Sequence, residues 1–222
     1  MLKLFKKKKE NKITGWNNLP VKYLKSINEI NRNESLSTDD KILNIVALIN
    51  NISYDEIIAL PLDEVKGLIK SCNFLYQAPK PNKYVRNLNL NGKKYEVMKE
   101  VTDISTAQFI DYNSLINDYD NKFIELLSIF IIPKGHKYNQ DYDIKEVISD
   151  IGNYLSVEEA LGLSNFFIKK YKRYITLILL YLEVTLRVMK RAKNTTPKMK
   201  EEIQNQITYL KKAQTEISSI FG

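Results

Sequence analysis

Hydrophobic residues recur at helical spacing along most of the chain. A first helix is expected to begin at Pro20, because proline suits the first turn of a helix. Its apolar stripe consists of Val21, Leu24, Ile27 and Ile30. Residues 40–50 have the apolar density of a buried helix, and a further helix is expected from Pro61 to about Tyr76. These patterns predict a mainly α protein.

An internal repeat indicates how these helices are organised. The pattern L-x-[LV]-[DE]-E-[VA]-x-G-L occurs twice, and two upstream segments also have partners in the same order. The matches pair residues 19–24 with 104–110, 41–49 with 122–130, and 60–68 with 155–163. Any two amphipathic helix starts resemble each other, so the shared order and the paired glycines favour duplication. We predict helical repeat 1 over residues 13–80 and helical repeat 2 over residues 103–192.

The repeats also carry signals for helix ends. Three serines stand three positions before Glu or Gln, the spacing of a capping box. The pairs are Ser53 with Glu56, Ser105 with Gln108, and Ser156 with Glu159. Gly67 and Gly162 lie inside predicted helices, where glycine costs ~1 kcal/mol relative to alanine. Close approach of another helix is the expected compensation. A short helix is also expected near residues 144–151.

Between the repeats, residues 81–102 are predicted to form a β-hairpin connector. Asn91-Gly92 is a strong hairpin signal, because both central residues of a tight turn take positive φ. Counting from the turn pairs Leu88 with Tyr95 and Arg86 with Val97. A lone hairpin is marginally stable in water, so this one packs on the helices, pairs with another chain, or extends as an arm.

A long C-terminal helix pair follows. The helical pattern is unbroken from Ser156 to about Arg191, roughly 50 Å at ~1.5 Å per residue. Its main stripe is Tyr171, Tyr174, Ile178, Leu182, Thr185 and Met189. Leu179, Leu180 and Leu186 widen this stripe, which predicts burial on more than one side.

The last segment, residues 193–222, is predicted to be a heptad-like helix that is capped by Thr196 and begins at Pro197. Its predicted seam is Met199, Ile203, Gln206, Leu210, Ala213, Ile217 and Ile220. Together with the hairpin, this helix supplies the expected protein interface. The candidate interface residues are Leu88, Tyr95, Val97, Ile203, Leu210 and Ile217.

The formal net charge of the 222 residues is +8, but it is unevenly distributed. The basic N-terminal tail, residues 1–12, has a net charge of +5, and residues 169–200 have ten Lys or Arg against Glu183 alone. Residues 13–168 have a net charge of −5. The sequence therefore indicates a mildly acidic body with two basic segments.

These basic segments have several interpretations. The tail can be a solvated end, an arm that contacts phosphates, or a contact with an anionic membrane, and its Leu2, Leu4 and Phe5 could dock on a partner. The cations at the end of the long helix are partly explained by the helix dipole. Non-specific binding to a nucleic-acid backbone also stays open. The candidate contacts for nucleic acid or an acidic partner are Lys3, Lys6, Lys7, Lys8, Lys9, Arg187, Lys190 and Arg191.

The sequence predicts no catalytic, metal or cofactor-binding residue. Its seven glycines form no phosphate-binding loop, and one cysteine with one histidine leaves no Cys/His metal set. His136 lies near Asp141 and Asp143, which we interpret as a polar loop. Cys72 is interpreted as a core residue, and Trp16 as an anchor for the N-terminal segment. No export signal and no membrane span are expected, which favours an intracellular origin.

The order of several short phrases resembles one group of proteins. The phrases are Trp-x-x-Leu-Pro-Val at 16–21, Leu-Pro-Leu-Asp-Glu at 60–64, Asn-Gly-Lys-Lys-Tyr-Glu-Val at 91–97, Thr-Asp-Ile-Ser-Thr-Ala-Gln-Phe-Ile-Asp at 102–111, and Ile-Pro-x-Gly…Tyr at 132–138. This layout resembles small structural or assembly proteins from tailed bacteriophages of Bacteroidetes hosts, crAss-like phages among them, over roughly residues 13–180.

The resemblance implies a non-enzymatic structural protein of the virion, made in the host cytoplasm and placed near the portal, connector or tail. Its partners would be other phage structural proteins in a ring or another symmetric assembly, with packaged DNA as a further contact. Two alternatives stay open at this stage. One is a transient assembly chaperone, and the other is a non-specific nucleic-acid-binding protein.

Overall fold

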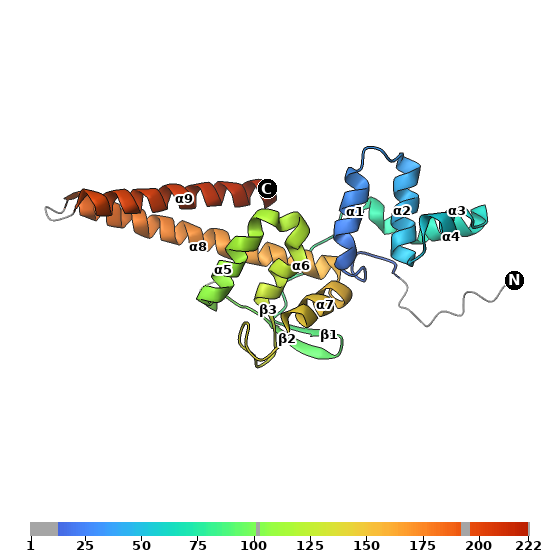
Figure 1. The fold of residues 1–222 in the computed structure, drawn as a ribbon, viewed down its shortest axis with the longest axis horizontal. Helices are drawn as coiled ribbons and strands as arrows, with labels where there is room; N and C mark the ends of the chain where they lie inside the picture. The colour runs from blue at the N-terminus through green and yellow to red at the C-terminus, as the bar shows by residue number, and fades with distance from the viewer. Residues whose placement is uncertain (1–12, 101–102, 192–195, 222) are drawn as a thin grey trace. The chain divides into compact units, whose positions relative to one another are not determined.

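The computed structural model describes residues 13–100, 103–191 and 196–221, and they are mainly helical (Figure 1). The elements are α1 (Lys22–Arg32), α2 (Thr38–Asn50), α3 (Tyr54–Ile58), α4 (Leu62–Ser71), η1 (Asn73–Tyr76), β1 (Asn87–Leu90), β2 (Lys93–Val97), α5 (Thr106–Leu115), η3 (Ile116–Asp118), α6 (Tyr119–Phe130), β3 (Ile131–Pro133), α7 (Ile144–Tyr154), α8 (Val157–Arg191) and α9 (Pro197–Phe221). The predicted mainly α class, with a hairpin and long C-terminal helices, is confirmed.

The chain divides into two compact units, which we describe separately. Unit 1 comprises Met1–Val97 and Ser105–Leu163, and unit 2 comprises Met98–Ile104 and Ser164–Gly222. The predicted division was different, since both repeats and the hairpin contribute to unit 1. The reason is the first turn of α8, where Val157 is fully buried in the core formed by α1, α2 and α3.

Two helices of repeat 1, α2 and α3, begin at a serine that caps them. The Ser37 side chain accepts a hydrogen bond from the Asp40 N–H at the start of α2, and Ser53 forms a full capping box with Glu56 at the start of α3. The helix expected from Pro61 to Tyr76 is interrupted at Cys72, where α4 ends and η1 follows. Cys72 is buried in the core of this region, as predicted.

The helices of repeat 2 occur in the order that a duplication requires. Helices α5, α6 and α8 follow one another as α1, α2 and α4 do, while the duplication itself stays a prediction. The capping boxes of Ser105 with Gln108 and Ser156 with Glu159 are both present. Buried Gln108 also donates from Nε2 to the Ile129 carbonyl at 2.7 Å, which joins α5 to α6.

Residues 19–21 of repeat 1 pair directly with residues 155–157 of repeat 2, although the repeat pattern matches these two segments to different partners. The Val21 N–H donates to the Leu155 carbonyl at 2.9 Å, and the Val157 N–H donates to the Leu19 carbonyl at 2.9 Å. These two bonds form an antiparallel bridge between the entry to α1 and the entry to α8. The start of the long helix is therefore fixed to the start of the chain's first helix.

The hairpin is folded back into unit 1 as part of a three-stranded antiparallel sheet of order β1-β2-β3. The predicted register is confirmed, with Leu88 opposite Tyr95. The third strand, β3, was missed because three residues are too short for an alternating pattern. The assignment of Leu88, Tyr95 and Val97 to an outer protein interface is wrong, because all three side chains are buried within this chain.

In unit 2, α8 and α9 run side by side in opposite directions (Figure 1). Their core contains Ile175, Leu179 and Leu186 of α8 against Ile207 of α9. The predicted seam named Gln206, which is exposed, in place of its neighbour Ile207. The expected burial of Leu180 is also wrong, because this side chain is 58% exposed.

The two helical glycines differ from the expectation of close helix packing. At Gly67 a Cβ would meet no atom within 4 Å, so the predicted close approach is wrong there. At Gly162 the close neighbour is the backbone of Asn82, which lies outside the helices and strands. The matched glycines of the two repeats therefore have different roles.

Candidate interaction surface

The largest exposed apolar feature described in unit 2 is a stripe along α8. Five of its large apolar side chains are between 48% and 69% exposed. We define the α8 stripe as Leu177, Leu180, Tyr181, Val184 and Val188. With about 100° between successive residues, these five positions share one face of the helix. We therefore take this contiguous exposed apolar face as the candidate interaction site of unit 2.

The α8 stripe lies opposite the face that packs on α9. Ile175, Leu179 and Leu186 project about half a turn away from the stripe and are buried against the other helix. Packing against α9 therefore covers one side of α8 and leaves the other side apolar and open. Of these five residues, the hydrophobic pattern of the sequence singled out only Leu180, for which it predicted burial.

Cations follow one edge of the stripe. We define the cationic edge as the exposed residues Lys169, Arg173 and Arg187. Lys190 is also exposed but projects nearer to buried Leu186, on the side of α8 that packs on α9. The opposite edge carries no charge and consists of the partly buried Ile178, Thr185 and Met189. The surface is therefore apolar in the middle and positive on one side only.

The acidic residues near this surface already have basic partners within unit 2. Glu183 lies 2.9 Å from Lys211 of α9, and Glu100 lies 2.7 Å from Lys170. The hydrogen bond and the charge of Lys211 lower the pKa of Glu183, with a further contribution from Arg187. The hydrogen bond from Lys170 likewise lowers the pKa of Glu100. Both carboxylates are therefore held in the charged form.

The structure places only some of the predicted contact residues on this surface. Arg187 and Lys190 are exposed, as a contact with nucleic acid or an acidic partner requires. Ile203 and Leu210 are partly buried toward α8, so they stabilise the helix pair instead of facing a partner. Six of the predicted residues have side chains outside the described part of the chain: Lys3, Lys6, Lys7, Lys8, Lys9 and Arg191. The side chain of Ile217 is outside it as well.

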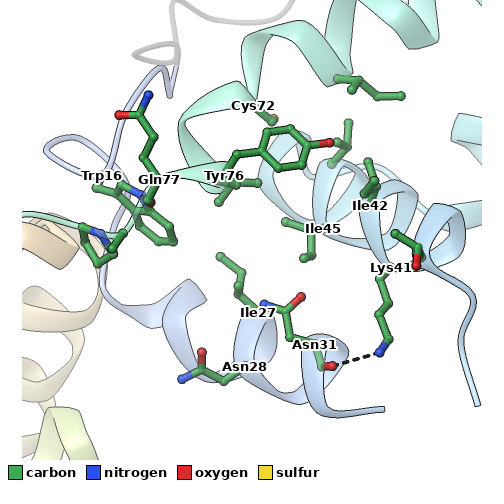
Figure 2. Close-up of a pocket in the computed structure, with 16 residues that line it drawn as sticks. Trp16, Ile27, Asn28, Asn31, Lys41, Ile42, Ile45, Cys72, Tyr76 and Gln77 are labelled. Carbon is green, nitrogen blue, oxygen red and sulfur yellow. Dashed lines mark hydrogen bonds between the residues drawn. The ribbon is translucent and has the colours of Figure 1, made fainter. Parts of the chain in front are cut away.

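A groove in unit 1 was not predicted from the sequence. It has a volume of about 400 Å³ and lies between α1, α2 and the segment that follows α4 (Figure 2). Its walls are mostly apolar, and amides such as Asn28 and Asn31 lie at its rim beside Lys41. Lys41 Nζ donates to the Asn31 carbonyl at 3.0 Å. The groove can accommodate an apolar side chain or a small apolar molecule.

Trp16 supports one end of this groove and anchors the N-terminal segment, as predicted. Its indole N–H donates to the carbonyl oxygens of Phe74 at 3.0 Å and Gln77 at 2.7 Å. Its ring also meets the edge of Phe74 at a centroid distance of 5.5 Å. At the back of the groove, burial raises the pKa of the Cys72 thiol, which disfavours the nucleophilic thiolate.

A polar cluster around the buried carboxylate of Asp150 joins the hairpin to α7. The carboxylate of Asp150 accepts hydrogen bonds from Tyr95 at 2.6 Å, Asn91 at 3.2 Å and Lys93 at 3.3 Å. Burial alone would raise the pKa of Asp150, but the bonds from Tyr95, Asn91 and Lys93 lower it overall. Lys93 also pairs with Glu146. Because these groups satisfy one another, the cluster serves to hold β1 and β2 on α7.

The remaining predicted polar residues do not converge. His136 lies exposed in the loop after β3, and its ring meets Tyr142 edge-on at 6.0 Å. Asp143 instead caps α7, where its side chain accepts a hydrogen bond from the Lys145 N–H at 2.9 Å. Across the described ranges, no group of three or more His, Cys, Asp or Glu side chains is placed to hold a metal ion. Among the helices that the structure describes, none is long and apolar enough to cross a bilayer.

No family model matches the chain, and neither the curated proteins nor the solved structures with which it was compared gave a match. The α8 stripe and its cationic edge are therefore the features on which a function can be argued.

Proposed function

We propose that the chain is a non-enzymatic structural protein of a tailed-phage virion, where it acts by packing against other proteins in a symmetric assembly. The single observation that carries the protein-packing part is the open apolar face of α8, opposite the face that α9 covers. The phage context is supported by the layout of short phrases over residues 13–180, and the place expected from it is the portal, connector or tail region.

The helix pair suits this role physically. Two antiparallel helices bury one face each against the other, so an apolar stripe on the far side of α8 remains in contact with water unless another element covers it. Covering apolar surface is favourable by about 25 cal/mol per Å². A neighbouring subunit that packs on the α8 stripe would supply this third layer.

Two alternative functions remain, and each can be distinguished from the structural role by experiment. A transient assembly chaperone would use the same apolar face but leave before the particle matures. A non-specific nucleic-acid-binding protein is favoured by the exposed Arg187 and Lys190. Such binding depends on phosphate contacts and weakens steeply with added salt.

Quantitative mass spectrometry of purified particles tests the proposal. The chain is expected in mature particles at a fixed ratio to the other virion proteins. A chain that is abundant in infected cells but absent from particles would indicate the chaperone. Tight binding of the full chain to duplex DNA at physiological salt, together with absence from particles, would favour the nucleic-acid function.

A further inference from the structure

We propose that the α8 stripe binds an acidic amphipathic helix of another protein, with its apolar face on the stripe and its carboxylates on the cationic edge. This inference rests on the proposed function and names the chemistry of the partner that the function requires.

The shape of the stripe fits a helix. Leu177, Tyr181, Val184 and Val188 follow a 4-3-4 spacing, which is the spacing of one side of a helix–helix seam. The stripe extends along three turns of α8, about 17 Å. An amphipathic helix laid along it would use apolar residues at positions i, i+3 or i+4 and i+7.

The positive charge beside the stripe favours a partner segment with acidic side chains. The cationic edge has three exposed basic side chains, and the only acidic residue of α8 beyond Ser164 is Glu183, one turn from Arg187. That carboxylate forms an ion pair with Lys211 of α9. Carboxylates that lie opposite the cationic edge must therefore come from the partner, and they would fix its register and orientation.

Unit 2 contains an example of this recognition on the same face of α8. Lys170 stands seven residues, two helical turns, before Leu177, so it projects in the direction of the stripe. It binds Glu100 at 2.7 Å, and the Arg173 charge further lowers the pKa of this carboxyl group. This contact shows a cation on this face of α8 paired with a carboxylate from another segment of unit 2.

A second copy of the chain would satisfy the surface poorly. If two α8 helices met antiparallel through their stripes about a two-fold axis, the two cationic edges would face each other. If they met parallel, each cationic edge would face the uncharged edge with Ile178, Thr185 and Met189. The one α8 carboxylate near this edge, Glu183, is already paired with Lys211 of its own α9, and like charges disfavour the first arrangement.

The test compares two labelled synthetic helical peptides with the same leucine face, one with glutamates and the other with lysines on the polar face. Binding to the full chain is measured by fluorescence anisotropy. The glutamate peptide is expected to bind at least about tenfold more tightly than the lysine peptide at physiological salt. Its affinity should fall about tenfold or more with Val184→Asp, and also with a triple glutamine substitution of the cationic edge.

Matched controls separate the stripe from the rest of the surface. Ile58→Asp changes an exposed apolar residue of α3, and Lys137→Gln with Lys145→Gln removes exposed charge from unit 1. These variants should bind the glutamate peptide as the unaltered chain does. Far-UV circular dichroism should show the same helix content in every variant, since each altered side chain is exposed.

Four results would overturn the inference. They are equal binding of the two peptides, no binding of either, concentration-dependent dimers that Val184→Asp abolishes, and binding to phosphatidylserine vesicles that the glutamate peptide does not displace. The proposed function can be tested independently of this inference. If the peptides do not bind but Val184→Asp still removes the chain from particles, the structural role stands and the acidic partner is wrong.

Discussion

The backbone carbonyl of Asn82 occupies the position that a Cβ on Gly162 would need. The oxygen would lie 2.1 Å from that Cβ, and the Asn82 N–H donates to the Glu158 carbonyl at 2.9 Å. Because backbone atoms form the obstacle, the segment cannot move aside without losing this bond. Gly162→Ala is expected to lower the free energy of unfolding by about 1–3 kcal/mol, measured by urea titration.

Substitution of the matching glycine of repeat 1 should change the free energy of unfolding in the opposite direction. Gly67 lies in the interior of α4, exposed, and a Cβ there meets no neighbouring atom. Gly67→Ala should raise the free energy of unfolding by about 0.5–1 kcal/mol, because alanine is the better helix former. Equal effects of the two substitutions would show that the Asn82 contact does not constrain Gly162.

The hydrogen bond between Tyr95 and Asp150 should couple the effects of these two residues on stability. Tyr95→Phe removes one hydrogen bond to a carboxylate and should cost about 1–2 kcal/mol, whereas Asp150→Ala leaves the Tyr95 hydroxyl buried without its acceptor and should cost about 3 kcal/mol. The double variant should cost less than the sum of the two single variants. Additive losses in urea unfolding would contradict a direct interaction.

The raised pKa of Tyr95 should make the stability of the chain depend on pH in the alkaline range. Burial and the hydrogen bond to Asp150 raise the pKa of Tyr95 above its unfolded value of about 10. The stability that this shift provides is fully present below about pH 10 and is lost as pH rises toward the folded-state pKa. The stability gap between the unaltered chain and Tyr95→Phe should therefore narrow above about pH 10 in urea titrations. A constant gap would contradict the raised pKa.

Two neighbouring leucines of α8 should respond differently to truncation. Leu179→Ala opens a cavity against α9 and should destabilise the helix pair by about 2–4 kcal/mol. Leu177→Ala changes an exposed residue and should alter stability by less than about 0.5 kcal/mol. Amide hydrogen exchange in α9 should accelerate with the first substitution only. Faster exchange with both would place Leu177 in the helix-pair core.

Local signals in the sequence predicted much of the fold. The three capping boxes, the Asn91-Gly92 turn and the restart at Pro197 each act within a few residues, so the sequence was sufficient to place them. Packing between distant segments was not visible in the same way. The approach of Asn82 to Gly162 and the third strand of the sheet depend on contacts across 34 or more residues.

The candidate surface was only partly predictable. Exposed Arg187 and Lys190 were expected from the charge pattern, but the α8 stripe was not. A helix that is apolar on most sides does not reveal which face its neighbour covers, and that depends on Ile207 of α9. The hairpin residue Tyr95 was misassigned for the same reason, because its burial requires α7 and β3.

Site-specific photo-crosslinking in assembling particles tests the central claim most directly. A photoreactive residue at position 184, in the middle of the α8 stripe, should form crosslinks to another particle protein through an acidic helical segment identified by mass spectrometry. The same probe at Lys25, an exposed position on α1, should form none with that segment. Absence of crosslinks from position 184, or identical crosslinks from both positions, would contradict the assignment of the α8 stripe as an interface.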